Sequence, residues 1–114
     1  MLKTKLKHLE NPEDITGALE KYKYVMICCG RMGPMCIPVY GIMEKLEPQY
    51  QHVQMRDLDY DTPTASYIEK LPECSSFMGL PLTVYFKNGK VVKATSSIQS
   101  EKQVKAILDT VFKD

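Results

Sequence analysis

Apolar and polar positions along the first quarter of the chain predict a helix followed by a buried strand. The segment Asn11–Asp14 begins the helix, because Asn can cap it, Pro suits the first helical position and the acids favour the positive end of the helix dipole. We expect this helix to run to about Lys21. The continuous apolar run Tyr24–Cys28 that follows is short enough to be a buried strand.

A second helix is predicted after this strand. It opens at Gly33-Pro34 and extends until Pro48 stops it. Pro38 lies inside the predicted helix, and we expect it to kink the first turns. The apolar positions of this helix are Ile37, Val39, Tyr40, Ile42, Met43 and Leu46.

The second half of the chain predicts a strand, a short helix and a hairpin. The segment His52–Tyr60 indicates a strand, and a short helix is expected from about Thr64 to Lys70. Two β-rich runs, 82–86 and 91–94, flank Asn88-Gly89. Asn-Gly between such runs is the strongest short-range signal for a β-hairpin.

The chain ends with a predicted capped helix. Ser100 and Gln103 resemble a capping box, and the residues after them form one apolar helical stripe. The order is then strand, helix, strand, helix, strand, helix, hairpin and helix, which favours an α/β core with parallel and antiparallel pairs in one sheet. At 114 residues, against about 150 per domain, we expect a single domain, 1–114. The stripe consists of Val104, Ile107, Leu108, Val111 and Phe112.

The composition argues against a nucleic-acid partner, a membrane-spanning segment and a secretory signal. The 15 Lys and Arg against 14 Asp and Glu leave a formal charge of +1, with no basic excess for gripping nucleic acid. The longest apolar run, around Val25–Cys29, is far shorter than the roughly 20 residues of a membrane span. Residues 1–7 lack the apolar core of a secretory signal, so we expect a cytoplasmic protein with reduced thiols. The four cysteines are then buried, catalytic or metal-binding rather than a disulfide framework.

The stretch Gly79–Lys90, which reads Gly-Leu-Pro-Leu-Thr-Val-Tyr-Phe-Lys-Asn-Gly-Lys, resembles the Gly-Ile-Pro-Thr stretch, strand and turn of the thioredoxin family. The segment Arg56–Asp61 is similar to the family's third strand, and the capped C-terminal helix also fits. The resemblance covers about Leu6 to Phe112. It implies a thioredoxin-like three-layer α/β fold, a central mixed sheet flanked by helices, and a cis bond between Leu80 and Pro81.

The active-site motif departs from that family. The family's Trp-Cys-Gly-Pro-Cys corresponds to part of the stretch 28–38, and without gaps the segment Met32–Met35 lies on Cys-Gly-Pro-Cys. A shift of one residue puts Cys36 at the second cysteine and Gly33 at the nucleophile's place. Neither register restores a Cys-x-x-Cys motif. The family's buried Asp on the preceding strand corresponds to Met26.

Cys36 is the best single candidate for a reacting thiol. It falls in the first turn of the predicted helix, where the dipole and free N–H groups stabilise a thiolate, and Arg31 adds positive potential. The alternative is a buried small apolar residue. Cys29, seven positions earlier at the strand end, is a candidate partner in a redox disulfide. Cys28 should point the other way and pack in the core.

A substrate site is implied beside these thiols. The resemblance to the thioredoxin family implies that the backbone of Leu80, next to Pro81, binds an extended substrate. The thioethers and thiols expected at the edge of the sheet near Cys36 are soft donors suited to Cu(I). Alternatively, the methionines there form an adaptable apolar groove for a partner peptide. We expect Cys74 to be incidental. The expected rim residues are Met32, Gly33, Pro34, Met35 and Met78.

The sequence therefore predicts a thioredoxin-like redox protein that carries out thiol–disulfide exchange through Cys36, either alone or together with Cys29. If it is an enzyme, the expected activity is that of a protein-disulfide reductase. We expect no cofactor, and partners that are protein thiols or disulfides, with a flavin-dependent disulfide reductase implied by the resemblance. We expect a monomer. The rival hypothesis is a non-catalytic binding module of the same fold with a Met-lined groove. The acidic positions Asp57, Asp59 and Asp61 are expected on the polar side of a strand and its turn.

Overall fold

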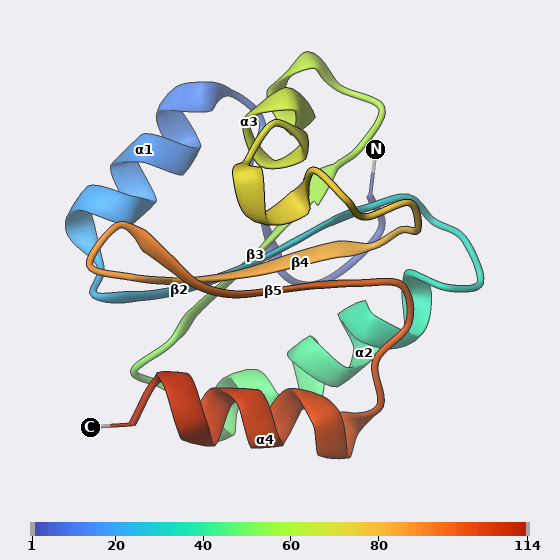
Figure 1. The fold of residues 1–114 in the computed structure, drawn as a ribbon. Coiled ribbons are helices and arrows are strands. Elements are labelled where there is room, and N and C mark those ends of the chain that lie inside the picture. The colour runs from blue at the N-terminus through green and yellow to red at the C-terminus, as the bar shows by residue number, and fades with distance from the viewer. Residues whose placement is uncertain (1, 114) are drawn as a thin grey trace.

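A five-stranded mixed sheet forms the centre of the molecule, in the order β1-β3-β2-β4-β5. The structure is a computed structural model that describes residues 2–113. Strands β1, β3 and β2 run parallel, and β4 runs antiparallel to both β2 and β5 (Figure 1). The strands are β1 Lys7–His8, β2 Tyr24–Gly30, β3 Gln54–Asp59, β4 Leu82–Lys87 and β5 Lys90–Ser96.

Helices cover both faces of this sheet. Figure 1 shows α1 and α3 on one face and α2 and α4 on the other. The helices are α1 Pro12–Lys21, α2 Ile37–Leu46, α3 Ser66–Glu69 and α4 Glu101–Val111, with short 3-10 turns at Glu47–Gln49, Pro63–Ala65 and Pro72–Cys74. This three-layer arrangement is the predicted α/β fold. Within residues 2–113, no helix has the length and apolar character needed to cross a bilayer.

Strand β2 is buried along its whole length and divides the core into two clusters. Successive side chains of a strand point to opposite faces of the sheet. Tyr24, Met26 and Cys28 therefore pack with α2 and α4, whereas Ile27 and Cys29 pack with residues of α1 and α3. The face to which a β2 residue points decides which neighbours it can meet.

The predicted helix caps at Asn11 and Ser100 and the hairpin turn are confirmed. The Asn11 side chain accepts a hydrogen bond from the Asp14 amide at 2.9 Å, and Ser100 forms a capping box with Gln103. The β4–β5 turn contains Asn88 at φ 52° and Gly89 at φ 77°. Positive φ at both central residues is what a tight hairpin turn of type I′ requires, which explains the Asn-Gly pair.

Helix α2 begins later than the sequence predicts. The Gly33 carbonyl accepts hydrogen bonds from the amides of Cys36 at 3.1 Å and Ile37 at 3.0 Å, so residues 33–36 form a turn before the helix. Pro38 is thus the second residue of α2 rather than an interior residue. A proline there breaks no helical hydrogen bond, because the first turn leaves its amides free.

The two edges of the sheet differ in length and shape. Strand β1 at one edge has only two residues. Strand β5 at the other edge has no buried residue, and the pairing shifts between Tyr85, opposite Lys93, and Phe86, opposite Val91. Val92 is left over on the edge strand as the extra residue of a β-bulge.

Candidate functional site

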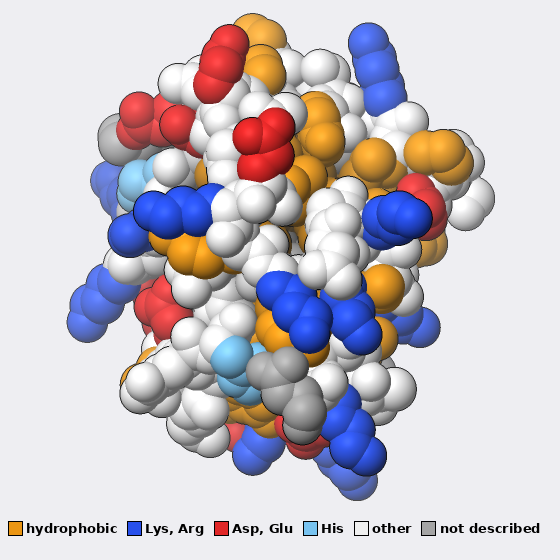
Figure 2. Space-filling model, turned by 90° about the vertical axis from the view of Figure 1, so that its left-hand side faces the viewer, with side chains coloured by type: hydrophobic (Ala, Val, Ile, Leu, Met, Phe, Trp, Pro, Cys, Tyr) orange, Lys and Arg blue, Asp and Glu red, His pale blue; other side chains and the backbone are white. Residues whose placement is uncertain are grey.

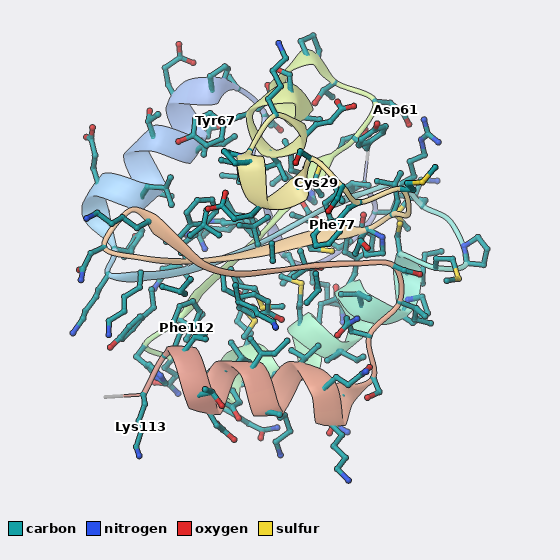
Figure 3. The ribbon with its side chains drawn as sticks, in the orientation of Figure 1. Cys29, Asp61, Tyr67, Phe77, Phe112 and Lys113 are labelled. Atoms are coloured by element: carbon teal, nitrogen blue, oxygen red, sulfur yellow. The ribbon has the colours of Figure 1, made fainter. Side chains whose placement is uncertain are left out.

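All four cysteines are free and buried, and the sheet separates them. Cys28 and Cys36 belong to the cluster under α2 and α4, whereas Cys29 and Cys74 belong to the cluster under α1 and α3. Figure 3 shows Cys29 on the α3 side of the sheet, near Phe77. The structure therefore does not bring Cys29 and Cys36 together as the sequence suggested, since Cys29 points to the opposite face of β2.

Cys36 is the residue immediately before α2 and takes the N-cap position. Its Sγ accepts a hydrogen bond from the Arg31 backbone amide at 3.5 Å. The side chain turns inward and is only 3% exposed. The sulfur therefore lies at the start of α2, at the positive end of the helix dipole.

Gly30, the last residue of β2, lies against three other groups of the site. A Cβ atom at this position would lie 2.7 Å from Tyr40 Oη, 2.8 Å from Cys36 Sγ and 3.1 Å from Pro81 Cβ. These three groups therefore converge where the glycine has no side chain. A larger residue at position 30 would force them apart.

Tyr40 is a member of this site that sequence reasoning assigned only to packing. It follows Cys36 by four residues, and residues at that spacing share one face of a helix. The spacing was the available signal. The sequence spacing does not reveal that the Tyr40 hydroxyl lies beside the Cys36 thiol.

The loop before β4 brings the predicted substrate-binding backbone to the same place. The Leu80–Pro81 bond is cis, as the sequence resemblance implied, and Pro81 approaches Gly30. Leu80 is partly buried and packs against both core clusters. The Pro81 carbonyl accepts a hydrogen bond from the Ser97 amide at 3.0 Å.

The predicted methionine rim is exposed. Met32 and Met35 are 40% and 42% exposed on the loop before α2, and Met78 is fully exposed on the loop before β4. Gly33 and Pro34 lie between the first two methionines. A cavity of about 330 Å³ is lined by Met78 together with Leu80, Cys74 and Arg31, among others. The exposed methionines are adjustable apolar side chains, whereas the accessible lining of this cavity is mostly polar and includes Glu69 as well as Arg31.

The Arg31 side chain makes its direct contacts with Asp61 and Tyr60, and its charge acts on Cys36 more weakly than on these two residues. Its Nε donates to both carboxylate oxygens of Asp61 at 3.0 Å, and the guanidinium lies 5.1 Å from the centre of the Tyr60 ring. Asp61 therefore offsets part of the positive potential at Cys36. Arg31 contacts Cys36 through its backbone amide instead.

Cys28 and Cys29 lie in environments that disfavour ionisation. Burial raises the pKa of Cys29 to about 12, and Glu69 and Cys74 add to the shift. Burial also raises the pKa of Cys28 well above its usual value, although the Thr83 hydroxyl, 3.8 Å from its Sγ, partly opposes this. Both are packing thiols in the folded protein, as expected for Cys28.

Asp57 is completely buried, so the expectation that it lies on the polar side of its strand is wrong. It pairs with Cys28 across the sheet and points to the α2 face. The His8 Nδ1 lies 2.6 Å from one carboxylate oxygen, and the Thr4 hydroxyl donates to the other. These two partners stabilise a carboxyl group that the sequence pattern alone would leave in solvent.

The opposite end of the molecule, near the Asn88-Gly89 turn, carries charged surface side chains. Figure 2 shows the end of the molecule remote from the β2–α2 loop, with Lys and Arg side chains spread over it. A cavity of about 570 Å³ there is lined by Lys21, Tyr22, Lys23 and the Asn88-Gly89 turn, among others. Within the described residues, no group of three or more His, Cys, Asp or Glu side chains is arranged to hold a metal ion.

Solved structures with the same architecture exist, although no family model and no curated protein matches the chain. A Plasmodium falciparum thioredoxin superposes with a TM-score of 0.77 at 15% identity, over 93% of this chain and 99% of that one. Thioredoxin O2 from Arabidopsis thaliana gives 0.75 at 15% identity, over 98% of both chains. Mitochondrial thioredoxin 3 from Saccharomyces cerevisiae gives 0.72 at 22% identity, over 91% and 94%. The chain therefore has the thioredoxin fold.

Proposed function

We propose that this thioredoxin-fold protein acts in thiol–disulfide exchange with Cys36 as its single reacting thiol. The observation that carries the proposal is the position of Cys36 Sγ at the start of α2, where it accepts a hydrogen bond from the Arg31 amide and faces Pro81 across Gly30. Donors and a helix N-terminus beside a thiol favour the reactive thiolate. Cys29 takes no part, because it lies in the other core cluster.

The proposed reaction begins with attack of the Cys36 thiolate on one sulfur of a substrate disulfide. A bond forms between Cys36 Sγ and that sulfur, the substrate S–S bond breaks, and its electron pair leaves with the second sulfur, which takes a proton from water. A small-molecule thiolate then attacks the substrate sulfur of the mixed disulfide and releases the Cys36 thiolate. The substrate thus becomes one free thiol and one mixed disulfide with the small thiol.

The substrate is proposed to be a protein disulfide held in extended form. Leu80, before Pro81, would offer its backbone to the substrate, and the exposed Met32–Met35 loop with Met78 would contact its side chains. Since Cys36 is 3% exposed, residues 31–35 must move for the two sulfurs to meet. A reducing compartment such as the cytoplasm would supply the thiol, either as a small molecule or through a flavin-dependent disulfide reductase.

A mixed-disulfide assay tests this proposal. The reduced protein is mixed with an aromatic disulfide, release of the aromatic thiol is followed by absorbance, and peptide mapping locates the adduct. Cys36→Ser should abolish the adduct, whereas Cys28→Ser, Cys29→Ser and Cys74→Ser should each retain it. An unchanged rate in Cys36→Ser would overturn the proposal. An adduct-free native protein that binds extended peptides would instead favour a binding module.

A further inference from the structure

The hydroxyl of Tyr40 is buried without a hydrogen-bond partner. The residue is 2% exposed, and no described residue lies within hydrogen-bonding geometry of its Oη. A buried hydroxyl without a partner is unfavourable, and it is uncommon in folded proteins. Such a group needs an explanation in terms of what it can bind when the protein acts.

Tyr40 Oη lies beside the sulfur of Cys36. The two atoms are 2.7 and 2.8 Å from the same point, the Cβ position that Gly30 lacks. Tyr40 follows Cys36 by one helical turn, and its amide donates to the Cys36 carbonyl at 3.2 Å. Both side chains therefore project from one face of the helix start toward the end of β2.

Tyr40 is suited to donate rather than to ionise. Burial, followed by the neighbouring Cys28 and Cys36, raises the pKa of its hydroxyl far above the usual value. Asp57 and Cys29 are the other titratable groups that act on it, and both push in the same direction. The hydroxyl thus keeps its proton and becomes a better donor as negative charge forms nearby, whereas a neutral thiol is only a weak acceptor.

We propose that Tyr40 donates its hydroxyl proton in a hydrogen bond to the Cys36 thiolate, as the side-chain counterpart of the Arg31 amide. This inference rests on the proposed function only in making Cys36 the reacting sulfur. The thiolate would have one donor from the β2–α2 loop and one from α2. In the thiol form the Tyr40 bond is absent, so it stabilises the reactive state selectively.

The test compares Tyr40→Phe with the matched control Tyr85→Phe. Tyr85 on β4 also has a buried hydroxyl without a partner, and its pKa is raised by burial and by Cys28, without a contribution from Cys36. Each full-length variant is alkylated with iodoacetamide over a range of pH, and modification of Cys36 is quantified by peptide mass spectrometry. Thermal unfolding of each variant verifies that it is folded.

Tyr40→Phe should displace the Cys36 alkylation profile toward higher pH and slow the reaction at neutral pH by roughly 10-fold or more, as loss of a hydrogen bond to a charged group implies. Tyr85→Phe should leave the profile unchanged. Removal of an unpartnered hydroxyl should not lower the unfolding temperature of either variant. Identical profiles for wild type and Tyr40→Phe would overturn the inference.

Alkylation and mixed-disulfide formation are measured separately, so that failure of the proposed function can be distinguished from failure of the Tyr40 inference. If wild-type Cys36 is alkylated with the Tyr40-dependent profile yet forms no mixed disulfide, the proposed function fails and the hydrogen bond stands. If mixed disulfides form at equal rates in wild type and Tyr40→Phe, with superimposable pH profiles, the function stands and the Tyr40 inference is wrong. An ultraviolet titration of thiolate absorbance in the same variants gives a second measurement that does not depend on access of the reagent.

Discussion

Gly30 is the residue on which the spacing of the candidate site depends. We predict that Gly30→Ala lowers the free energy of unfolding by about 1–3 kcal/mol, because its Cβ would lie 2.8 Å from Cys36 Sγ and 3.1 Å from Pro81 Cβ. Gly33→Ala is the control, since nothing lies within 4 Å of the corresponding Cβ. Urea denaturation of both variants measures the difference. Equal stabilities would mean that the site accommodates the methyl group by local movement.

Asp57 should make stability depend on pH in a defined direction. Burial raises the pKa of this carboxyl above its usual 3.8, although Thr4 and His8 partly offset the shift. Between 3.8 and the raised value, the folded state holds a proton that the unfolded state has lost, so the contribution of Asp57 to stability falls as the pH rises.

Asp57→Asn should therefore remove part of this fall. The difference in unfolding free energy, variant minus wild type, should increase as the pH rises from about 3 to about 7, as measured by denaturation at each pH. Asp61→Asn, at an exposed carboxylate paired with Arg31, controls for a general effect of lost charge. A difference that decreases over this range would contradict the assigned direction.

The residues of the candidate site could be predicted from the sequence less completely than the fold. Cys36 could be selected from its position at a helix start. Cys29 could not be excluded, because alternation along β2 gives Cys28 and Cys29 opposite faces without saying which face carries α2. Asp57 was misjudged because its partners, Thr4 and His8, lie about fifty residues earlier in the chain. Contacts between distant segments leave no local pattern.

At the scale of elements, the β4–β5 hairpin depends on one glycine conformation. Gly89 has φ 77°, where a side chain is strained, so Gly89→Ala should lower the unfolding free energy by about 1–2 kcal/mol. Gly41→Ala in α2 should have the opposite sign and raise it by about 0.5–1 kcal/mol, because the added Cβ meets nothing within 4 Å. Thermal unfolding of the pair checks both signs, and a stabilised Gly89→Ala would exclude the positive-φ turn.

Elements with strong local signals were predictable for a physical reason. Asn11, Ser100 and the Asn88-Gly89 turn satisfy backbone groups with their own neighbours, so the sequence contains the whole interaction. The start of α2 was not predictable in this way. Gly33-Pro34 is equally compatible with a helix and with the turn that the structure contains, and packing of Cys36 and Tyr40 against β2 decides between them.

At the scale of the molecule, the sheet places Cys28 and Cys36 on one face and Cys29 and Cys74 on the other. Cys29, with a pKa of about 12, should remain unmodified by iodoacetamide at about pH 8, where very little of it is thiolate. After unfolding it should react as fast as an ordinary cysteine. Peptide mapping of native and unfolded protein measures this, with Cys36 as the internal reference. Faster labelling of Cys29 than of Cys36 in the native state would contradict the arrangement.

The bulge in β5 has a consequence for how copies of the protein behave toward one another. An edge strand with free amides and carbonyls is a template onto which another chain can add. Here β1 offers only two residues, while β5 carries Lys90 and Lys93 and is interrupted at Val92. The shortness of β1 and the positive charge and interrupted pairing of β5 make each edge a poor partner for a second sheet, so we expect the protein to resist fibril-like growth at high concentration.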